Sequence, residues 1–280
     1  MGLSVMLLVL LGAGLHATWN GLVKGGADRY LDLVGLLAAA AVLSFLWLLF
    51  LPPPARASWP YLAASTLIHQ AYFALIALSY RKGDLSLVYP ITRGSAPAFT
   101  ALAAAIWLHE RSTPFGTLGV CLVSGGVLLL ALDRKRGERL KAEPILLALA
   151  NAAMIVLYTL VDGSGVRLSG NAFSYTNWGF VLCALLFVPT GLVLRKQAAI
   201  AHLKRHWPVC SIGAACSVAS YSLALWAMTK APIASVAALR ETSILFGVII
   251  AVVHLKERMG RLRLIAVAVI LMGAVAIKLG

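Results

Sequence analysis

Charged residues are scarce in this chain. Asp, Glu, Lys and Arg make up 12% of the 280 residues, whereas soluble globular domains carry about 25%. Apolar residues account for 61%, compared with roughly 45–50% in ordinary globular proteins. This composition excludes an ordinary soluble domain and indicates a membrane protein.

Long connecting loops are also lacking. Ten apolar segments are each long enough to cross roughly 30 Å of hydrocarbon as an α-helix, and connections of 4 to 13 residues join them. The expected spans are 3–23, 31–51, 60–80, 85–108, 115–132, 144–161, 173–194, 208–228, 233–254 and 262–279. The first has no Lys or Arg at its start, so we interpret it as a retained helix and not as a secretory signal. We therefore expect an all-α membrane protein, multi-pass in the cell (inner) membrane.

Motifs of enzymes and metal sites are missing. The 4 cysteines fall within expected spans without a CxxC pair or a histidine at metal-ligand spacing, which is typical of small core residues. HER (109–111) lacks the second histidine of HExxH, and neither a GxSxG elbow nor a Walker loop occurs. We expect no enzymatic activity, no cofactor and no metal; an integral membrane enzyme remains a remote alternative.

The cations are unevenly distributed along the chain. The net charge is +14, but the cations lie mostly in short loops, where they set topology and do not indicate a nucleic-acid partner. Loops after spans 1, 3, 5, 7 and 9 hold 17 of the 22 loop and tail cations, and the opposite side holds 5. The positive-inside rule predicts that DRKRGERLKAE (133–143), RKQAAIAHLKRH (195–206) and LKERMGRLR (255–263) face the cytoplasm, with both termini outside.

An internal repeat accounts for the two remaining cations, Arg93 and Arg240. Each lies 17 residues before the Glu of an HER or KER tripeptide, Glu110 or Glu257, and a shift of 147 residues superimposes the two patterns. A shift of 138 matches GLVKGG (21–26) with TLVDGS (159–164). We predict two five-helix units, residues 1–132 and 144–280, joined by the basic loop 133–143. Because five is odd, the second unit is inverted relative to the first.

Both arginines are expected near the bilayer centre. Arg93 lies about eight residues, or roughly 12 Å, into its span, and Arg240 about seven residues, or roughly 10 Å, from the other surface. Guanidinium groups stay protonated and are costly in lipid, so we predict that they face a shared hydrated cavity. Two structural alternatives stay open: a carbonyl freed at Pro90 or Pro97 neutralises Arg93, or an acid near Arg240 pairs with it.

The repeat and its motifs resemble the drug/metabolite transporter superfamily, in particular its EamA-type members. The resemblance covers essentially the whole chain and rests on LVYPITRGSAP (87–97) with WLHER (107–111) and on ALRETSILFGVIIAVVHLKER (238–258). LHATWNGLVKGG (15–26) looks like the opening of a bacterial branch sometimes linked to phosphonate utilisation. The resemblance implies that spans 1, 3, 4, 6, 8 and 9 surround a central cavity, with spans 5 and 10 outside, and it implies alternating access. Many family members have both termini in the cytoplasm, opposite to the charge count here.

Polar residues of these spans are the candidate substrate-binding groups. His16 and Asn20 share one helical face, as do Tyr89 and Arg93. Glu241 is the candidate coupling residue, a proton carrier or else a static counter-charge; His16 and His69 are alternative proton carriers. Glu110 and Glu257 are expected to serve in ion pairs or at helix ends. The full set of candidate binding residues is Arg93, Arg240, His16, Trp19, Asn20, His69, Gln70, Tyr72, Tyr89, Asn151, Tyr158 and Tyr221.

A transporter is the function that these groups favour. Two midplane arginines with His, Asn and Tyr donors suit a small organic acid, amino acid or phosphonate. We expect a secondary-active transporter of small polar, anionic metabolites, with proton coupling as an option. A lipid-head-group translocase on the same scaffold is the alternative. The expected partners are the small-molecule substrate and the lipid bilayer, and a functional monomer is expected because one chain holds both halves of the cavity.

Overall fold

The structure is a computed structural model of the chain, and it describes residues 1–25, 28–82, 85–110, 112–132, 142–253 and 260–280. The described residues form helices and no β-strand. The helices are α1 (Leu3–Gly25), α2 (Arg29–Leu48), α3 (Trp59–Lys82), α4 (Leu85–Trp107), α5 (Pro114–Leu129), α6 (Ala142–Leu168), α7 (Ala172–Met228), α8 (Ile233–Arg240), α9 (Ser243–Val253) and α10 (Arg261–Leu279), with short 3₁₀ turns at Arg56–Ser58 and Leu130–Leu132. Glu257 and most of the predicted loop 133–143 lie outside the described residues.

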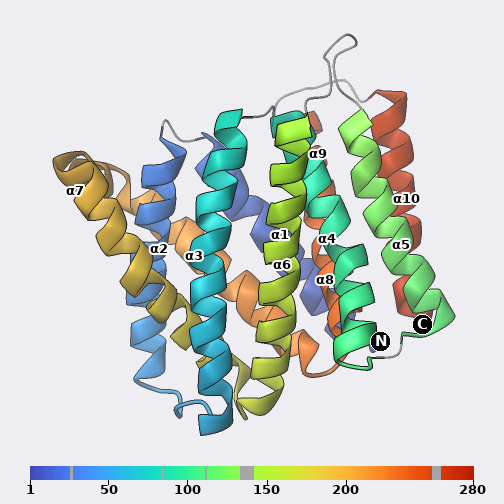
Figure 1. Cartoon of the computed structure of the whole chain (residues 1–280), viewed down its shortest axis with the longest axis horizontal. Coiled ribbons are helices and arrows are strands. Elements are labelled where there is room, and N and C mark those ends of the chain that lie inside the picture. Colours follow the sequence, from blue (N-terminus) through green and yellow to red (C-terminus); the bar gives the residue numbers. More distant parts are fainter. Residues whose placement is uncertain (26–27, 83–84, 111, 133–141, 254–259) are drawn as a thin grey trace.

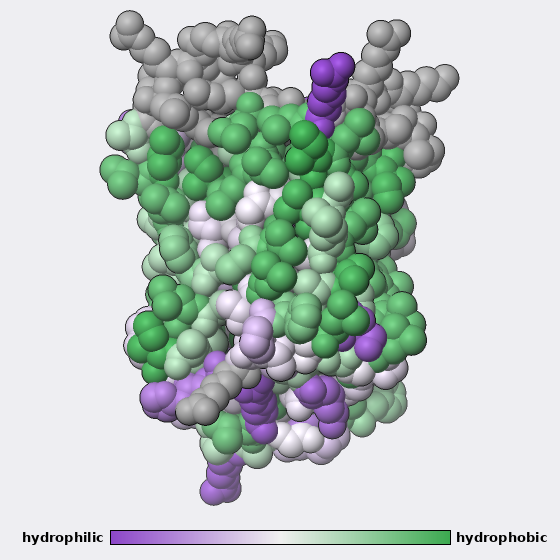
Figure 2. Space-filling model, turned by 90° about the vertical axis from the view of Figure 1, so that its right-hand side faces the viewer, coloured by the Kyte–Doolittle hydropathy of each residue, from purple (hydrophilic) through white to green (hydrophobic). Residues whose placement is uncertain are grey.

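The length and surface of these helices are those of a membrane protein. In the described part of the chain, six helical segments are long and apolar enough to cross a bilayer: Leu3–Val23, Tyr30–Leu48, Pro114–Leu132, Ala142–Leu168, Ala172–Met228 and Arg261–Leu279. Apolar side chains cover the middle of the face in Figure 2, and hydrophilic ones gather toward one end. Large apolar side chains are also exposed on other helices of the bundle, for example Phe50, Leu194 and Leu264. The chain is therefore an all-helical, multi-pass membrane protein.

The structure differs from the predicted loops in two helices, α7 and α6. Residues 195–206 were expected to be a loop, but they are helical apart from a break at Lys196 (φ 44°, ψ −121°), where the two parts of α7 join. Figure 1 shows the chain turning back at this point. The residues after Lys196 include Ala198, Ala199 and Ala201, which are good helix formers, so the second helix of α7 begins inside the basic segment and not after it.

The end of α6 was also placed too early. The span was expected to end at residue 161, but α6 continues to Leu168. The sequence DGSG (162–165) follows the predicted end of the span, but its glycines provide close packing within α6. A Cβ on Gly163 would lie 2.5 Å from the Ile233 side chain, and one on Gly165 would lie 2.6 Å from Tyr61 Cβ. Tertiary contacts thus keep this segment helical against its low propensity.

The expected span 233–254 is interrupted at its middle. α8 ends at Arg240 and α9 begins at Ser243, with Glu241 and Thr242 in a turn between them. Here backbone N–H groups bond to carbonyls three residues earlier: Thr242 to Leu239, and Leu245 to Thr242. Such breaks expose backbone groups, and in membrane proteins they are tolerated only where protein or a cavity surrounds them. The break places Arg240 and Glu241 in the interior, and both are buried.

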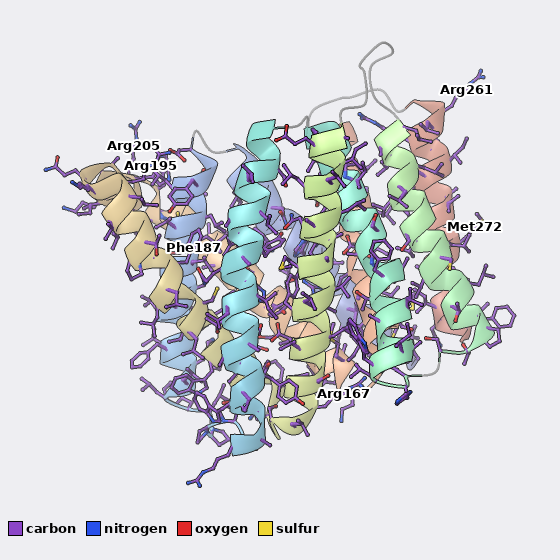
Figure 3. All side chains as sticks on the ribbon, viewed as in Figure 1. Arg167, Phe187, Arg195, Arg205, Arg261 and Met272 are labelled. Carbon is purple, nitrogen blue, oxygen red and sulfur yellow. The ribbon has the colours of Figure 1, made fainter. Side chains whose placement is uncertain are left out.

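The helices are arranged so that the pair α5 and α10 stands at one side of the bundle, and α2 and the first part of α7 stand at the other (Figure 1). The two termini lie near the same end. Figure 3 places Arg195, Arg205 and Arg261 at the end opposite Arg167. This separation matches the predicted grouping of the basic loops on one side.

α5 and α10 approach each other through glycines, which gives a test of the packing. A Cβ on Gly119 would lie 2.7 Å from the Gly273 carbonyl oxygen, whereas one on Gly125 would meet nothing within 4 Å. We expect Gly119→Ala to reduce the free energy of unfolding by about 1–3 kcal/mol, because the backbones must separate. Gly125→Ala is the matched control and should be neutral or stabilise by up to about 1 kcal/mol. Thermal unfolding of both variants in one detergent measures the difference; equal midpoints would contradict the close contact.

Candidate functional site

A cavity of about 160 Å³ lies among α1, α2, α3, α4, α6, α7 and α8. None of its described lining residues comes from α5 or α10, in line with the expectation that these helices stand outside. α2 and the first part of α7 contribute lining residues as well, which the resemblance did not imply. Of the candidate binding residues, the cavity brings together His16, Trp19, Asn20, His69, Tyr72, Tyr89, Arg93, Tyr158, Tyr221 and Arg240.

Arg93 is neutralised inside the protein. Its Nε lies 2.8 Å from Glu241 Oε2, an ion pair whose N–H bond is poorly aligned with the oxygen. Its Nη2 lies 3.3 Å from His16 Nε2. The counter-charge of Arg93 is therefore Glu241. This acid is adjacent to Arg240 in sequence, but it pairs with the arginine of the first half of the chain. A proline-freed carbonyl is not the partner that the structure shows.

Arg240 has a different environment. Its side chain is buried, and its Cζ lies 5.1 Å from the centroid of the Tyr221 ring, a cation–π contact. In the described part of the chain no carboxylate oxygen lies within 4.0 Å of its guanidinium, and its Nε has no hydrogen-bond partner. Of the two intramembrane arginines, Arg240 is thus the one that lines the cavity without a salt bridge among the described residues; the adjacent Glu241 acts on it only at longer range.

Asp162 is a cavity residue that sequence reasoning missed. Its side chain is 2% exposed and lines the cavity. Tyr175 Oη donates to Oδ1 at 3.0 Å, and Tyr221 Oη donates to Oδ2. The predicted span ended one residue before Asp162, so this acid was assigned to a loop. The signal was present in the repeat, because Asp162 is the position that aligns with Lys24 in GLVKGG.

Aromatic rings form one wall of the cavity. His69 stacks on Tyr158 at a centroid distance of 4.4 Å, and Tyr221 lies edge-on to His69 at 6.3 Å. Tyr72 meets Tyr158 edge-on at 5.7 Å. His69 Nδ1 lies 2.9 Å from the Ser65 carbonyl oxygen, which can only accept, so this contact places the ring proton on Nδ1. The other ring nitrogen, Nε2, is then an acceptor.

Three predicted residues lie outside the cavity lining. Gln70 Nε2 donates to the Cys183 carbonyl at 3.2 Å and ties α3 to α7. Asn151 is fully buried in α6, and its amide has no hydrogen-bond partner within the described residues. Glu241 contacts Arg93, as described above, and does not itself line the cavity.

A polar clasp, made of Glu110, Arg167 and the backbone of residues 228–233, lies toward the end of the bundle that carries the termini. Arg167 Nη2 lies 2.8 Å from Glu110 Oε1, and Arg167 Nε donates to the Met228 carbonyl at 2.8 Å. Glu110 Oε2 accepts from the Ile233 N–H, at the start of α8, at 2.8 Å. Glu110 thus has the pairing and helix-end role expected for it. The clasp ties the segment after α4 to the ends of α6 and α7.

The fold is shared with solved structures. One, described only as "Crystal structure of protein", has a TM-score of 0.77 and 16% sequence identity, with 100% of this chain and 98% of that chain covered. At this identity the similarity concerns the fold alone. Among curated proteins, no sequence matches at a significant level.

A family comparison covers the second half of the chain. The model of the EamA-like transporter family matches residues 143–279. This range begins at the predicted second unit and includes Asp162, Tyr221, Arg240 and Glu241. This half of the chain thus matches the EamA-like transporter family, which is part of the drug/metabolite transporter superfamily.

Proposed function

We propose that the protein is a secondary-active transporter of small polar, anionic metabolites that works by alternating access around the central cavity. The observation that carries this proposal is Arg240, a buried cation that lines the cavity with no carboxylate in salt-bridge distance among the described residues. An unpaired charge in a low-dielectric site is costly, and an anionic ligand that binds there relieves the cost. Arg93 is already paired, so the site offers one available positive charge.

The proposal includes ten spans in two inverted five-helix units. The helical segments support this count, because α7 contains two helices joined at Lys196, and α8 with α9 occupies the range of one expected span. The ion pair between Arg93 and Glu241 joins the two units at the cavity. Binding sites between such units are where alternating access operates in transporters built from repeats.

Reconstitution into liposomes tests the function. Purified protein should accelerate uptake of at least one labelled small organic anion, from a panel of carboxylates, amino acids and phosphonates, above the rate of protein-free liposomes. Unlabelled substrate should compete with this uptake. Uptake of no member of the panel would count against an anion transporter.

The polar clasp is proposed as the gate at the end of the bundle near the termini. Toward that end, the lining reaches Asp162, Tyr175 and Leu225, and the buried side chains of Met228 and Ile233 lie beyond them. The clasp holds the α7–α8 turn over these side chains. Alternating access requires this end to open, so the bonds of Arg167 and Glu110 should break in the cycle.

Removal of the clasp arginine should open this end. In a background without native cysteines, we expect Arg167→Gln to raise the labelling rate of Leu225→Cys by a membrane-impermeant thiol reagent about 10-fold. Three interactions of Arg167 are lost, and a shift of about 1.4 kcal/mol corresponds to that factor. Lys230→Gln, an exposed cation on the same turn, is the control and should leave labelling unchanged. An unchanged rate with Arg167→Gln would show that the clasp is not a gate.

A further inference from the structure

We propose that Asp162 binds a protonated amine of the transported molecule, so that the cavity selects zwitterions over simple anions. The inference rests on the proposed transport function and names the substrate class of the same cavity. Besides Arg240, the cavity contains a second charged group without a salt bridge among the described residues, the carboxylate of Asp162.

Among the described residues, the hydrogen-bond partners of the Asp162 carboxylate are neutral. Two tyrosine hydroxyls donate to it, and in the described part of the chain no Lys, Arg or His nitrogen lies within salt-bridge distance. An ionised carboxylate accepts about four hydrogen bonds, so two acceptor positions remain. Because Asp162 lines the cavity and is otherwise buried, a ligand is the group that can reach these positions.

Tyr221 connects this acid to the free arginine. Its ring lies under the Arg240 guanidinium at 5.1 Å, and its hydroxyl donates to Asp162. The cavity therefore presents a cation and an anion on either side of one tyrosine, too far apart to pair directly. A ligand that carries both charges compensates both groups at once. A simple anion compensates Arg240 alone and is repelled by Asp162.

The rings around Asp162 also suit a cation. Tyr175 and Tyr221 contact the carboxylate, and Tyr158 with His69 continues the same wall. Ammonium groups are attracted to the faces of such rings, most strongly when they are desolvated.

The experiment compares matched pairs of substrates in proteoliposomes. The pairs are α-, β- and γ-amino acids and the same acids without the amine. We expect wild-type protein to transport at least one amino compound about 30-fold faster than its deaminated partner, as expected when a buried charge pair loses one member. Asp162→Asn should remove most of this preference, with transport of the deaminated acid unchanged or increased. Asp162→Glu, which keeps the charge, should retain the preference.

The outcomes separate this inference from the proposed function. If wild-type protein transports no anion of either kind, the proposed function fails. If it transports deaminated acids as well as amino acids, the function stands and the role of Asp162 is overturned. The same holds if Asp162→Asn keeps the amine preference, or changes only the pH dependence of uptake. If Asp162→Asn does not fold, wild-type stabilisation by amino acid over deaminated acid, measured as a thermal shift, decides the question.

Discussion

Arg240→Gln is expected to reduce the initial rate of anion uptake by at least about 30-fold, the lower end of the cost of removing one member of a buried charge pair. The substrate anion loses the cavity cation that has no salt bridge among the described residues, whereas Glu241 already neutralises Arg93. Arg240→Lys keeps the charge but loses the planar two-pronged donor geometry, so it should restore only part of the rate. The rates are measured in proteoliposomes with equal amounts of folded protein.

A matched control exists for this substitution. Arg261→Gln makes the same change at the start of α10, where the side chain projects away from the bundle (Figure 3). It should leave uptake unchanged. Because Arg240 makes no salt bridge with a described carboxylate, its replacement should lower the thermal stability of the protein much less than replacement of Arg93. Normal uptake by Arg240→Gln would show that the cargo is held elsewhere.

Arg93→Gln is expected to act on stability. It leaves Glu241 buried beside the cavity without its counter-charge, a change that typically costs 3–5 kcal/mol, so we expect a loss of about 3 kcal/mol. Glu241→Gln alone leaves Arg93 unpaired and should cost a similar amount. The double variant Arg93→Gln/Glu241→Gln removes both charges and should recover most of the loss. Unfolding of all four proteins in the same detergent gives the coupling free energy.

The expected contrast is between two arginines that occupy equivalent places in the repeat. Arg240→Gln should reduce transport and keep stability, whereas Arg93→Gln should reduce stability first. Additive losses in the double variant would mean that the ion pair contributes no coupling. If the double variant also regained proton-coupled transport, Glu241 would be a static counter-charge and not a proton carrier.

Much of the site could be predicted from the sequence. Intramembrane arginines are costly, and that cost directed attention to Arg93 and Arg240 and to the polar residues near them. Ten of these residues do line one cavity, including His16 from α1 and Tyr158 from α6. The apolar segments likewise predicted an all-helical membrane protein. The position of a helix and the cost of placing a charged side chain in the membrane depend on neighbouring residues in the chain, so both can be predicted from the sequence.

Pairings between distant helices could not be predicted in the same way. Glu241 is adjacent to Arg240 in sequence, but the break after α8 directs its carboxylate to Arg93 of α4. Asp162 was missed because the apolar segment was taken to end at residue 161, whereas packing against Ile233 and Tyr61 extends the helix. Asn151 was expected at the cavity, but its side chain is enclosed by protein. These results depend on tertiary contacts that no short window contains.

The ion pair between Arg93 and Glu241 and the polar clasp tie the two halves of the chain at different heights. When the clasp opens, the central pair still joins the halves, as do the contacts of Asp28 with Arg195 and of Asp32 with His202 toward the opposite end. An ion pair at the middle of the bundle opposes separation of the two halves but allows them to rotate, because a guanidinium and a carboxylate can turn against each other while they stay in contact. The pair would then act as a fulcrum, and a small rotation about it would widen one mouth of the cavity as it narrows the other.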